Sequence, residues 1–273
     1  MKFYSADYIL PITSKPIEQG IIAIDDNNVI QKIGSSEEFP AIDIQKFDGV
    51  LLPGFVNAHC HLELSHMKGK TKTGTTLIPF ISDVVKFRDF DKAIIEAAIE
   101  QQDMEMYDSG IQAVGDISNK VDTAMVKRKS PVAYYTFVEM FDFMQEKLTA
   151  PTIAQYSEVF KQQDGTGNNK KSFVPHAPYS VSQNLFEFIN DNNPDDVTIS
   201  LHNQETLAEN QLFMEASGDF YAFYEGFGFS LDGFEAIGKG SIYYALKEMK
   251  PKARNLFVHN TLSTESDIRA AHE

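Results

Sequence analysis

The sequence has little of what marks several specialised classes of protein. It contains one cysteine, no tryptophan, and 24 Lys and Arg against 39 Asp and Glu, which gives a net charge of −15. The single cysteine, Cys60, cannot form an internal disulfide, and one thiol excludes a zinc site built from several thiolates. No eighteen apolar residues run together, and no long apolar core follows Lys2. We therefore expect a cytoplasmic protein without a membrane span.

The acidic balance also argues against nucleic acid as a partner. Nonspecific affinity for phosphate backbones comes from clustered Lys and Arg, and the one basic cluster, at residues 127–129, is short. We interpret it as the solvated end of a helix. The remaining partner class is a small-molecule substrate, and a homo-oligomer stays open.

The chain changes character near residue 50. Residues 1–50 contain short apolar runs and a hairpin turn at residues 25–28, typical of a small β portion. Residues 51–273 alternate apolar runs with helical stretches, which predicts an α/β fold with a parallel sheet, closed as a barrel or wound openly. Six runs are expected as strands, at residues 50–59, 111–117, 132–138, 172–176, 197–202 and 256–259.

The number of expected strands falls short of a complete barrel. A (β/α)8 barrel typically takes about 250 residues, whereas only about 220 follow the β portion. The last expected helix opens at Thr264, and the sequence stops inside it without a terminating glycine. We therefore expect a barrel that is incomplete at its C-terminal end.

Four of the seven histidines stand at the ends of expected strands. His59 ends the first run, His176 the fourth, His202 the fifth and His259 the sixth. Catalytic residues of βα barrels collect at the C-terminal ends of the strands. The pattern therefore predicts one site at that end.

The most specific element is the pair His59 and His61. In an extended segment, residues i and i+2 point the same way, so both imidazoles can reach one ion while Cys60 faces the opposite side. His202 would supply a third imidazole, and three protein ligands with an open position are typical of a catalytic metal site. Imidazole suits Zn²⁺ and Fe²⁺ alike. Glu205, three residues after His202, could accept a proton from water.

Two further histidines could complete the site. His259 could polarise or orient the attacking water, or help to bind substrate. His176 lies in a turn between Pro175 and Pro178, which favours a side chain aimed at a ligand. The alternatives are core histidines bonded to the backbone and, for Glu205, a helix cap.

Three segments together resemble one known family. Residues 50–61, 175–182 and 201–206 resemble the amidohydrolase superfamily, in the branch that holds the S-adenosylhomocysteine, guanine and aminodeoxyfutalosine deaminases and the triazine chlorohydrolases. The resemblance covers almost the whole chain. It implies a (β/α)8 TIM-type barrel, with about six βα units in residues 51–273, and a small β-sandwich portion in residues 1–50.

The resemblance also implies roles for particular residues. His59, His61 and His202 would bind one divalent transition metal, zinc first and iron as the alternative. Glu205 would shuttle protons and His259 would assist the water. The substrate contacts would be His176 and, two residues after the metal pair, Glu63.

The sequence departs from the family pattern at its end. The family's remaining metal ligand is an aspartate after the eighth strand, and its β-sandwich is completed by C-terminal strands; neither is found after the sixth strand here. We therefore expect the 273-residue chain alone to be inactive and to fold with difficulty. Activity of this chain would point to another aspartate, such as Asp116 or Asp232.

The implied reaction is hydrolytic deamination of an aminated purine-type heterocycle or nucleoside. A water activated by the metal would attack the amino-bearing carbon, and ammonia would leave. Two alternatives stay open. One is hydrolysis of a chloride or amide at the same site, and the other is a metal-binding fragment without turnover.

Overall fold

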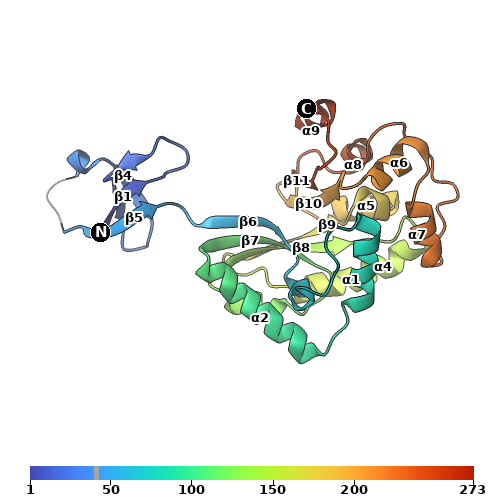
Figure 1. Ribbon diagram of the computed structural model, residues 1–273, viewed down its shortest axis with the longest axis horizontal. Helices are drawn as coiled ribbons and strands as arrows, with labels where there is room; N and C mark the ends of the chain where they lie inside the picture. The colour runs from blue at the N-terminus through green and yellow to red at the C-terminus, as the bar shows by residue number, and fades with distance from the viewer. Residues whose placement is uncertain (40–42) are drawn as a thin grey trace. The chain divides into compact units, whose positions relative to one another are not determined.

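The computed structural model describes residues 1–39 and 43–273 (Figure 1). Contacts divide the chain into two compact units, Met1–Phe55 and Val56–Glu273. The boundary expected from the sequence, between residues 50 and 51, falls inside strand β5 (Gln45–Leu51), which pairs with β1 of the first unit. No helix in the described part of the chain combines the length and apolar character needed to cross a membrane.

The first unit is a small five-stranded sheet around β1 (Lys2–Ile9). Strand β1 pairs antiparallel with β2 (Ile17–Glu18) and β3 (Ile21–Ile24), and parallel with β5. The expected turn at residues 25–28 joins β3 to β4 (Ile30–Gly34), with the Asp25 carboxylate accepting the N–H groups of Asn27 and Val29. The described residues of this unit form one sheet, so a sandwich stays a prediction.

The second unit contains six strands that follow chain order. Strands β6, β7, β8 and β9 form one hydrogen-bonded series, and β10 pairs parallel with β11. The two series meet where the His202 N–H donates to the His176 carbonyl oxygen. The six strands are β6 (Phe55–Cys60), β7 (Ile111–Ser118), β8 (Ala133–Met140), β9 (Lys170–Pro175), β10 (Thr198–Asn203) and β11 (Arg254–His259).

Two expected elements are divided in the structure. The run at 50–59 is split between β5 and β6 because Pro53 and Gly54 interrupt the ladder. The helical stretch at residues 77–107 predicts one long helix, but two helices form, because Asp91 starts the second one by accepting the Ala93 N–H. They are α1 (Leu77–Phe87) and α2 (Lys92–Asp108).

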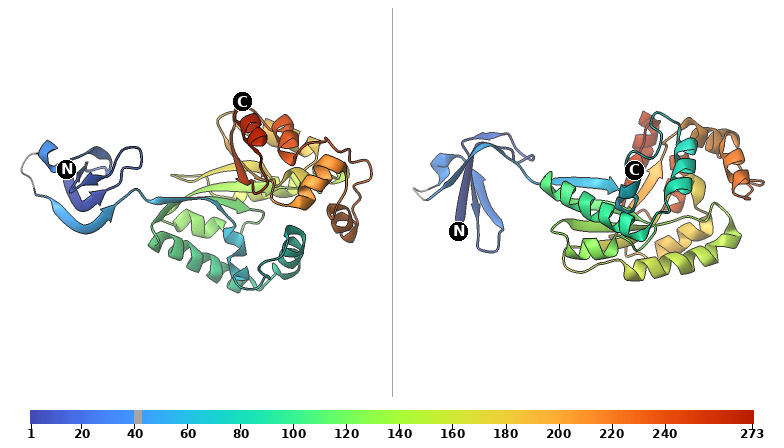
Figure 2. Two further views of the ribbon diagram at one scale, coloured as in Figure 1. Left: turned by 45° about the horizontal axis from the view of Figure 1, so that its top comes forward. Right: turned by 60° about the horizontal axis from the view of Figure 1, so that its bottom comes forward.

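The remaining helices lie between and after the strands (Figure 2). The last one starts as expected at Thr264, whose hydroxyl accepts the Asp267 N–H while the Asp267 carboxylate accepts the Thr264 N–H. The α-helices are α3 (Ala124–Lys129), α4 (Glu146–Gln162), α5 (Gln183–Asp191), α6 (Leu207–Glu215), α7 (Phe220–Gly226), α8 (Ser241–Glu248) and α9 (Glu265–His272). Short 3-10 turns occur at η1 (Ser36–Glu38), η2 (Leu62–Met67) and η3 (Pro178–Ser180).

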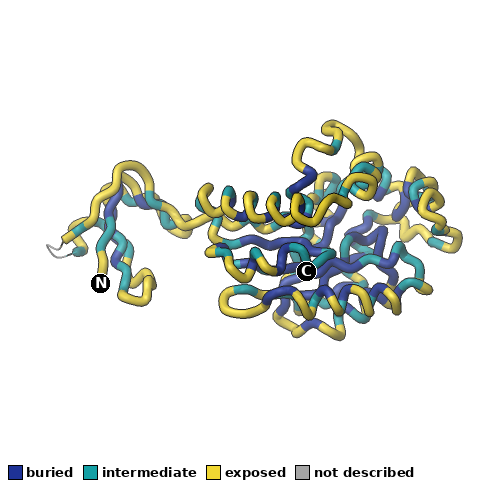
Figure 3. Tube along the Cα trace, turned by 90° about the horizontal axis from the view of Figure 1, so that it is seen from below, coloured by how far each residue is buried: buried dark blue, intermediate teal, exposed yellow. Residues whose placement is uncertain are grey.

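The main core of this unit lies on its central strands (Figure 3). Val138 of β8, Val174 of β9 and Leu201 of β10 are fully buried against helices such as α5, which contributes Leu185. Every residue of β10 is buried, whereas β6 and β11 keep exposed or half-buried positions. The outer strands of the series are therefore less covered than the central ones.

Candidate metal and catalytic centre

Three histidines from two distant strands converge on one point. The Nε2 atoms of His59 and His61 lie 3.2 Å apart. The Nε2 atom of His202, 141 residues from His61, lies 3.3 Å from that of His61. The possible ligand atoms of all three lie within 4.8 Å of one another. Cys60, between the pair, instead packs with Leu62 and Val114 in a separate apolar cluster.

The protonation of these rings follows from their surroundings. Burial, with His202 and His61 as neighbours, lowers the pKa of His59 to about 3. Burial also lowers the pKa of His61 to about 4. Burial alone would lower the pKa of His202, but its contact with Glu139 outweighs burial and raises that pKa to about 9. His59 and His61 are therefore neutral at pH 7 and carry lone pairs for a cation.

These nitrogen atoms fit a divalent transition metal. Two ligands of a tetrahedral ion with bonds near 2.05 Å stand about 3.3 Å apart, which agrees with the 3.2 Å and 3.3 Å separations here. The Nδ1 atom of His202 lies 2.9 Å from the His176 carbonyl oxygen, which can only accept, so Nδ1 carries a proton. Its Nε2 is then the nitrogen that a cation would bind, and binding would displace the proton that the raised pKa keeps on it at pH 7.

Glu205 and His259 form a second pair beside this cluster. The Nε2 atom of His259 lies 3.0 Å from Oε1 of Glu205, and the Tyr179 hydroxyl donates to Oε2 of Glu205 at 3.1 Å. The His259 ring centroid is 5.5 Å from that of His202 and 5.6 Å from that of His59. Burial lowers the pKa of His259. A carboxylate with one hydroxyl donor and one imidazole next to a metal position can accept and return a proton.

Local backbone geometry places these two side chains. The Gln204 and Glu205 N–H groups both donate to the buried Glu209 carboxylate, which fixes the segment after β10. His259 ends β11 with φ 76° and Asn260 follows with φ 52°. The Asn260 N–H donates to the Asn203 carbonyl oxygen, so the ends of β10 and β11 are tied together.

His176 lies next to the cluster, whereas the hydrogen bonds and the ion pair of Glu63 are with other residues. The His176 ring centroid is 5.0 Å from that of His202, and its Nδ1 lies 2.7 Å from the Ser180 hydroxyl. Glu63 is buried in η2, with Oε1 3.2 Å from Arg88 and Oε2 accepting the N–H groups of Asn119 and Lys120. Burial raises the pKa of Glu63 to about 7. A substrate contact of either residue stays a prediction.

Glu139 also faces the cluster, although the sequence did not predict it. This residue, at the end of β8, is 2% exposed, and its Oε1 lies 3.3 Å from Nδ1 of His202. The possible ligand atoms of Glu139, His176 and His202 also lie within 4.8 Å of one another. Burial would raise the pKa of Glu139, but His176 and His202 hold that pKa well below its usual range. The feature of the sequence that could have indicated Glu139 is a single acidic residue at the end of an apolar strand.

Neither aspartate named as an alternative ligand joins the histidines. Asp116 is buried in β7, where it accepts the Leu62 N–H and lies 2.6 Å from Lys127. Asp232 is exposed in the segment before α8. Among the described residues, the groups that could hold an ion contain neither aspartate.

The interpretation of residues 127–129 as a solvated helix end is wrong for Lys127. This side chain is 1% exposed and also donates to the hydroxyls of Ser118 and Thr136. Arg128 and Lys129 are exposed, as expected. Periodicity alone did not reveal that Lys127 turns inward to pair with Asp116.

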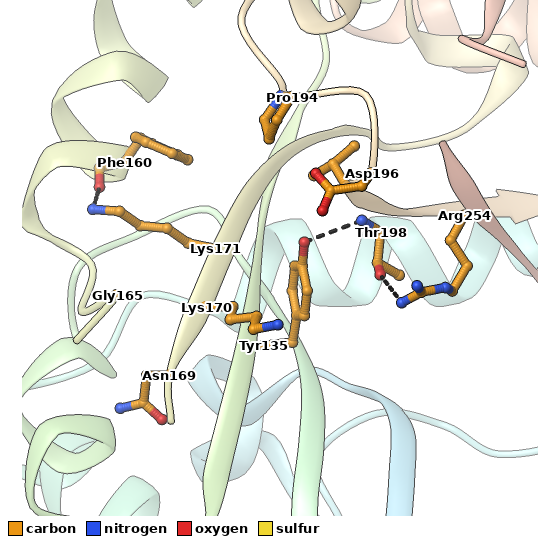
Figure 4. A pocket seen from close by; sticks show the side chains of 11 residues that line it. Tyr135, Phe160, Gly165, Asn169, Lys170, Lys171, Pro194, Asp196, Thr198 and Arg254 are labelled. Atoms are coloured by element: carbon orange, nitrogen blue, oxygen red, sulfur yellow. Dashed lines mark hydrogen bonds between the residues drawn. The ribbon is translucent and has the colours of Figure 1, made fainter. Parts of the chain in front are cut away.

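A hollow of about 440 Å³ lies at the opposite end of the strands (Figure 4). It is lined by the first residues of β9, β10 and β11, namely Lys170, Thr198 and Arg254. Tyr135 accepts the Thr198 N–H, and Arg254 donates to the Thr198 hydroxyl. Because the histidines stand at the C-terminal ends, this hollow is separate from their site, on the face that contributes to stability in barrel enzymes.

The order of the strands and the histidines at their ends agree with a comparison of the sequence with known families. Residues 50–271 match the profile of the Amidohydrolase family. The chain belongs to this family. The family's α/β, TIM-barrel-like fold accounts for the alternation of strands and helices in Val56–Glu273.

Relatives within the family carry deaminase names. The chain is 29% identical over 234 residues to an adenosine deaminase of Helicobacter pylori, covering 83% of this chain and 55% of that protein. It is 27% identical over 258 residues to a 5′-deoxyadenosine deaminase of Methanococcus maripaludis, covering 87% and 59%. The chain thus spans between 55% and 59% of the length of these curated relatives.

Solved structures show the same fold. The aminofutalosine deaminase of Helicobacter pylori superposes with a TM-score of 0.77 at 23% identity, covering 99% of this chain and 67% of that one. The zinc complex of an atrazine chlorohydrolase from Arthrobacter aurescens superposes with a TM-score of 0.72 at 15% identity, covering 99% and 63%. At these identities the likeness concerns the fold alone.

Proposed function

We propose that this amidohydrolase binds one divalent transition metal through His59, His61 and His202 and hydrolytically deaminates an aminated purine-type heterocycle or nucleoside. The observation that carries the proposal is the convergence of these three imidazoles with the Glu205–His259 pair beside them. Zinc is the first choice of metal, because zinc is bound in the related chlorohydrolase, and iron is the alternative.

The role of the ion is general to such sites. When bound, a divalent metal supplies the nucleophile by lowering the pKa of water from about 15.7 toward ~7. The transfer of a proton from this water to the leaving amine depends on the residues around the ion.

Glu205 is the proposed proton carrier. Its Oε2 is oriented by the Tyr179 hydroxyl, and its Oε1 faces His259. Glu205 takes the proton of the attacking water and returns it to the leaving amine. His259, which contacts Glu205, assists the same water. His176, beside His202, is placed to contact the substrate.

The class of substrate rests on the names of the relatives. Adenosine deaminase and 5′-deoxyadenosine deaminase both specify an adenosine-type substrate. An amine on a purine ring is therefore the first choice. The chlorohydrolase among the similar structures keeps a chloride leaving group as the alternative.

The test measures the leaving group directly. The natural gene product, loaded with zinc, is incubated with adenosine, 5′-deoxyadenosine, guanine and a chlorotriazine, and ammonia and chloride are quantified. Ammonia release from at least one purine, absent in a His61→Ala control, is the expected result. Chloride release without ammonia, or no release of either by protein shown to hold zinc, would overturn the deaminase proposal.

A further inference from the structure

We infer that Glu139 is a positioning residue for the metal centre, whose carboxylate orients His202 and supplies the buried negative charge that the bound cation requires. The inference rests on the proposed metal binding by His202. It adds a residue on β8 to a site otherwise built from the ends of β6, β10 and β11.

The first support is the geometry around His202. Its Nδ1 atom faces two acceptors, the His176 carbonyl oxygen at 2.9 Å and Oε1 of Glu139 at 3.3 Å. Both acceptors favour a proton on Nδ1 and so leave Nε2 to the ion. A carboxylate behind an imidazole also raises its basicity, which strengthens it as a ligand.

The second support is the distribution of charge. Other buried carboxylates of this unit are satisfied either by a basic side chain, as Asp116 is by Lys127, or by several hydrogen bonds, as Glu209 is by the Ser241 hydroxyl and two backbone N–H groups. Among the ion pairs of residues 1–39 and 43–273, Glu139 pairs with His202 and with no Lys or Arg. Its Oε1 is also a buried atom without a well-aligned hydrogen bond. A buried charge needs a partner, and a cation at the histidines provides one.

The third support is that Glu139 is itself held in place. The Asn119 side-chain amide donates to Oε2 of Glu139 at 3.1 Å and to the Glu139 carbonyl oxygen at 2.9 Å. The Asn119 N–H in turn donates to Glu63. A chain of hydrogen bonds thus runs from Glu63 through Asn119 to Glu139, which faces His202. A carboxylate fixed at both its backbone and its second oxygen can fix the ring that it contacts.

The experiment compares zinc affinity in the native protein and Glu139→Gln by competition with a chromogenic chelator. We expect zinc affinity to fall about 10- to 100-fold, the usual effect of removing such an outer partner. Nitrogen-15 NMR of zinc-loaded protein should show a shifted Nδ1–H signal for His202. The matched control is Asp103→Asn, a buried carboxylate whose partners are Ser130 and Tyr134, and it should bind zinc like the native protein.

The outcomes separate the two proposals. Equal zinc affinity of native protein and Glu139→Gln would overturn the role of Glu139 alone. Failure of the native protein to bind zinc would overturn the proposed metal site, and this inference with it. If circular dichroism shows that Glu139→Gln does not fold, zinc affinity is measured for Asn119→Ala instead. It frees the carboxylate without removing its charge, so it should weaken zinc binding several-fold, and unchanged affinity would reject the inference.

Discussion

Oε1 of Glu205 and Nε2 of His259 lie 3.0 Å apart, although Glu205 follows β10 and His259 is the last residue of β11. Glu205→Gln keeps the shape of this contact but removes the proton acceptor. Turnover of the natural gene product should fall at least about 100-fold, the usual scale of general acid–base catalysis, while zinc content stays the same. Steady-state kinetics and metal analysis check this. Undiminished turnover would reject the proton-carrier role, and loss of zinc would make Glu205 a ligand.

His61 stands between the other two proposed ligands, since its Nε2 contacts the Nε2 atoms of both His59 and His202. We expect His61→Ala to lose stoichiometric zinc, measured by elemental analysis after dialysis, because two remaining imidazoles make a poor site. The control is His272→Ala, an exposed histidine in α9. Full zinc content in His61→Ala would contradict the ligand set.

The Lys127–Asp116 pair predicts a large effect on stability. Lys127→Met leaves the fully buried Asp116 without its cation, so the free energy of unfolding should fall by about 3–5 kcal/mol in denaturant titrations. Lys129→Met, two positions along on the exposed surface, should change it by no more than about 0.5 kcal/mol. Similar values for the two variants would show that the buried pair contributes little.

Cys60 should be unreactive in the folded protein. Burial, together with the nearby Asp116, raises the pKa of Cys60 to about 12. Only about one thiol in ten thousand is then ionised at pH 8, and the thiolate is the nucleophile. A disulfide reagent should label Cys60 slowly at pH 8 and rapidly in denaturant, with the native rate rising as the pH approaches 12. Fast labelling of folded protein at pH 8 would contradict the raised pKa.

The sequence predicted the part of the site that depends on strand ends. His59, His61 and His202 could be placed together because barrel strands bring their C-terminal ends to one face whatever their separation along the chain. The period of two in an extended segment also put Cys60 on the other side, where it packs with Leu62 and Val114.

The remainder depends on contacts that periodicity does not encode. Glu139 follows the same strand-end rule, but the expected strand stopped at residue 138 and β8 runs on to Met140. Lys127 looked solvated because its partner, Asp116, is on another element. The break between α1 and α2 depends on one hydrogen bond, from the Ala93 N–H to Asp91.

The left-handed backbone at His259 affects both the stability of the protein and its proposed catalysis. Asparagine tolerates such a conformation, as Asn260 does, but for most other side chains it costs roughly 1–2 kcal/mol. Glycine would relieve that cost and give a sturdier connection after β11, yet it would leave Glu205 without its imidazole neighbour. Thermal stability would therefore favour glycine at this position and catalysis favours histidine, so the residue present favours catalysis.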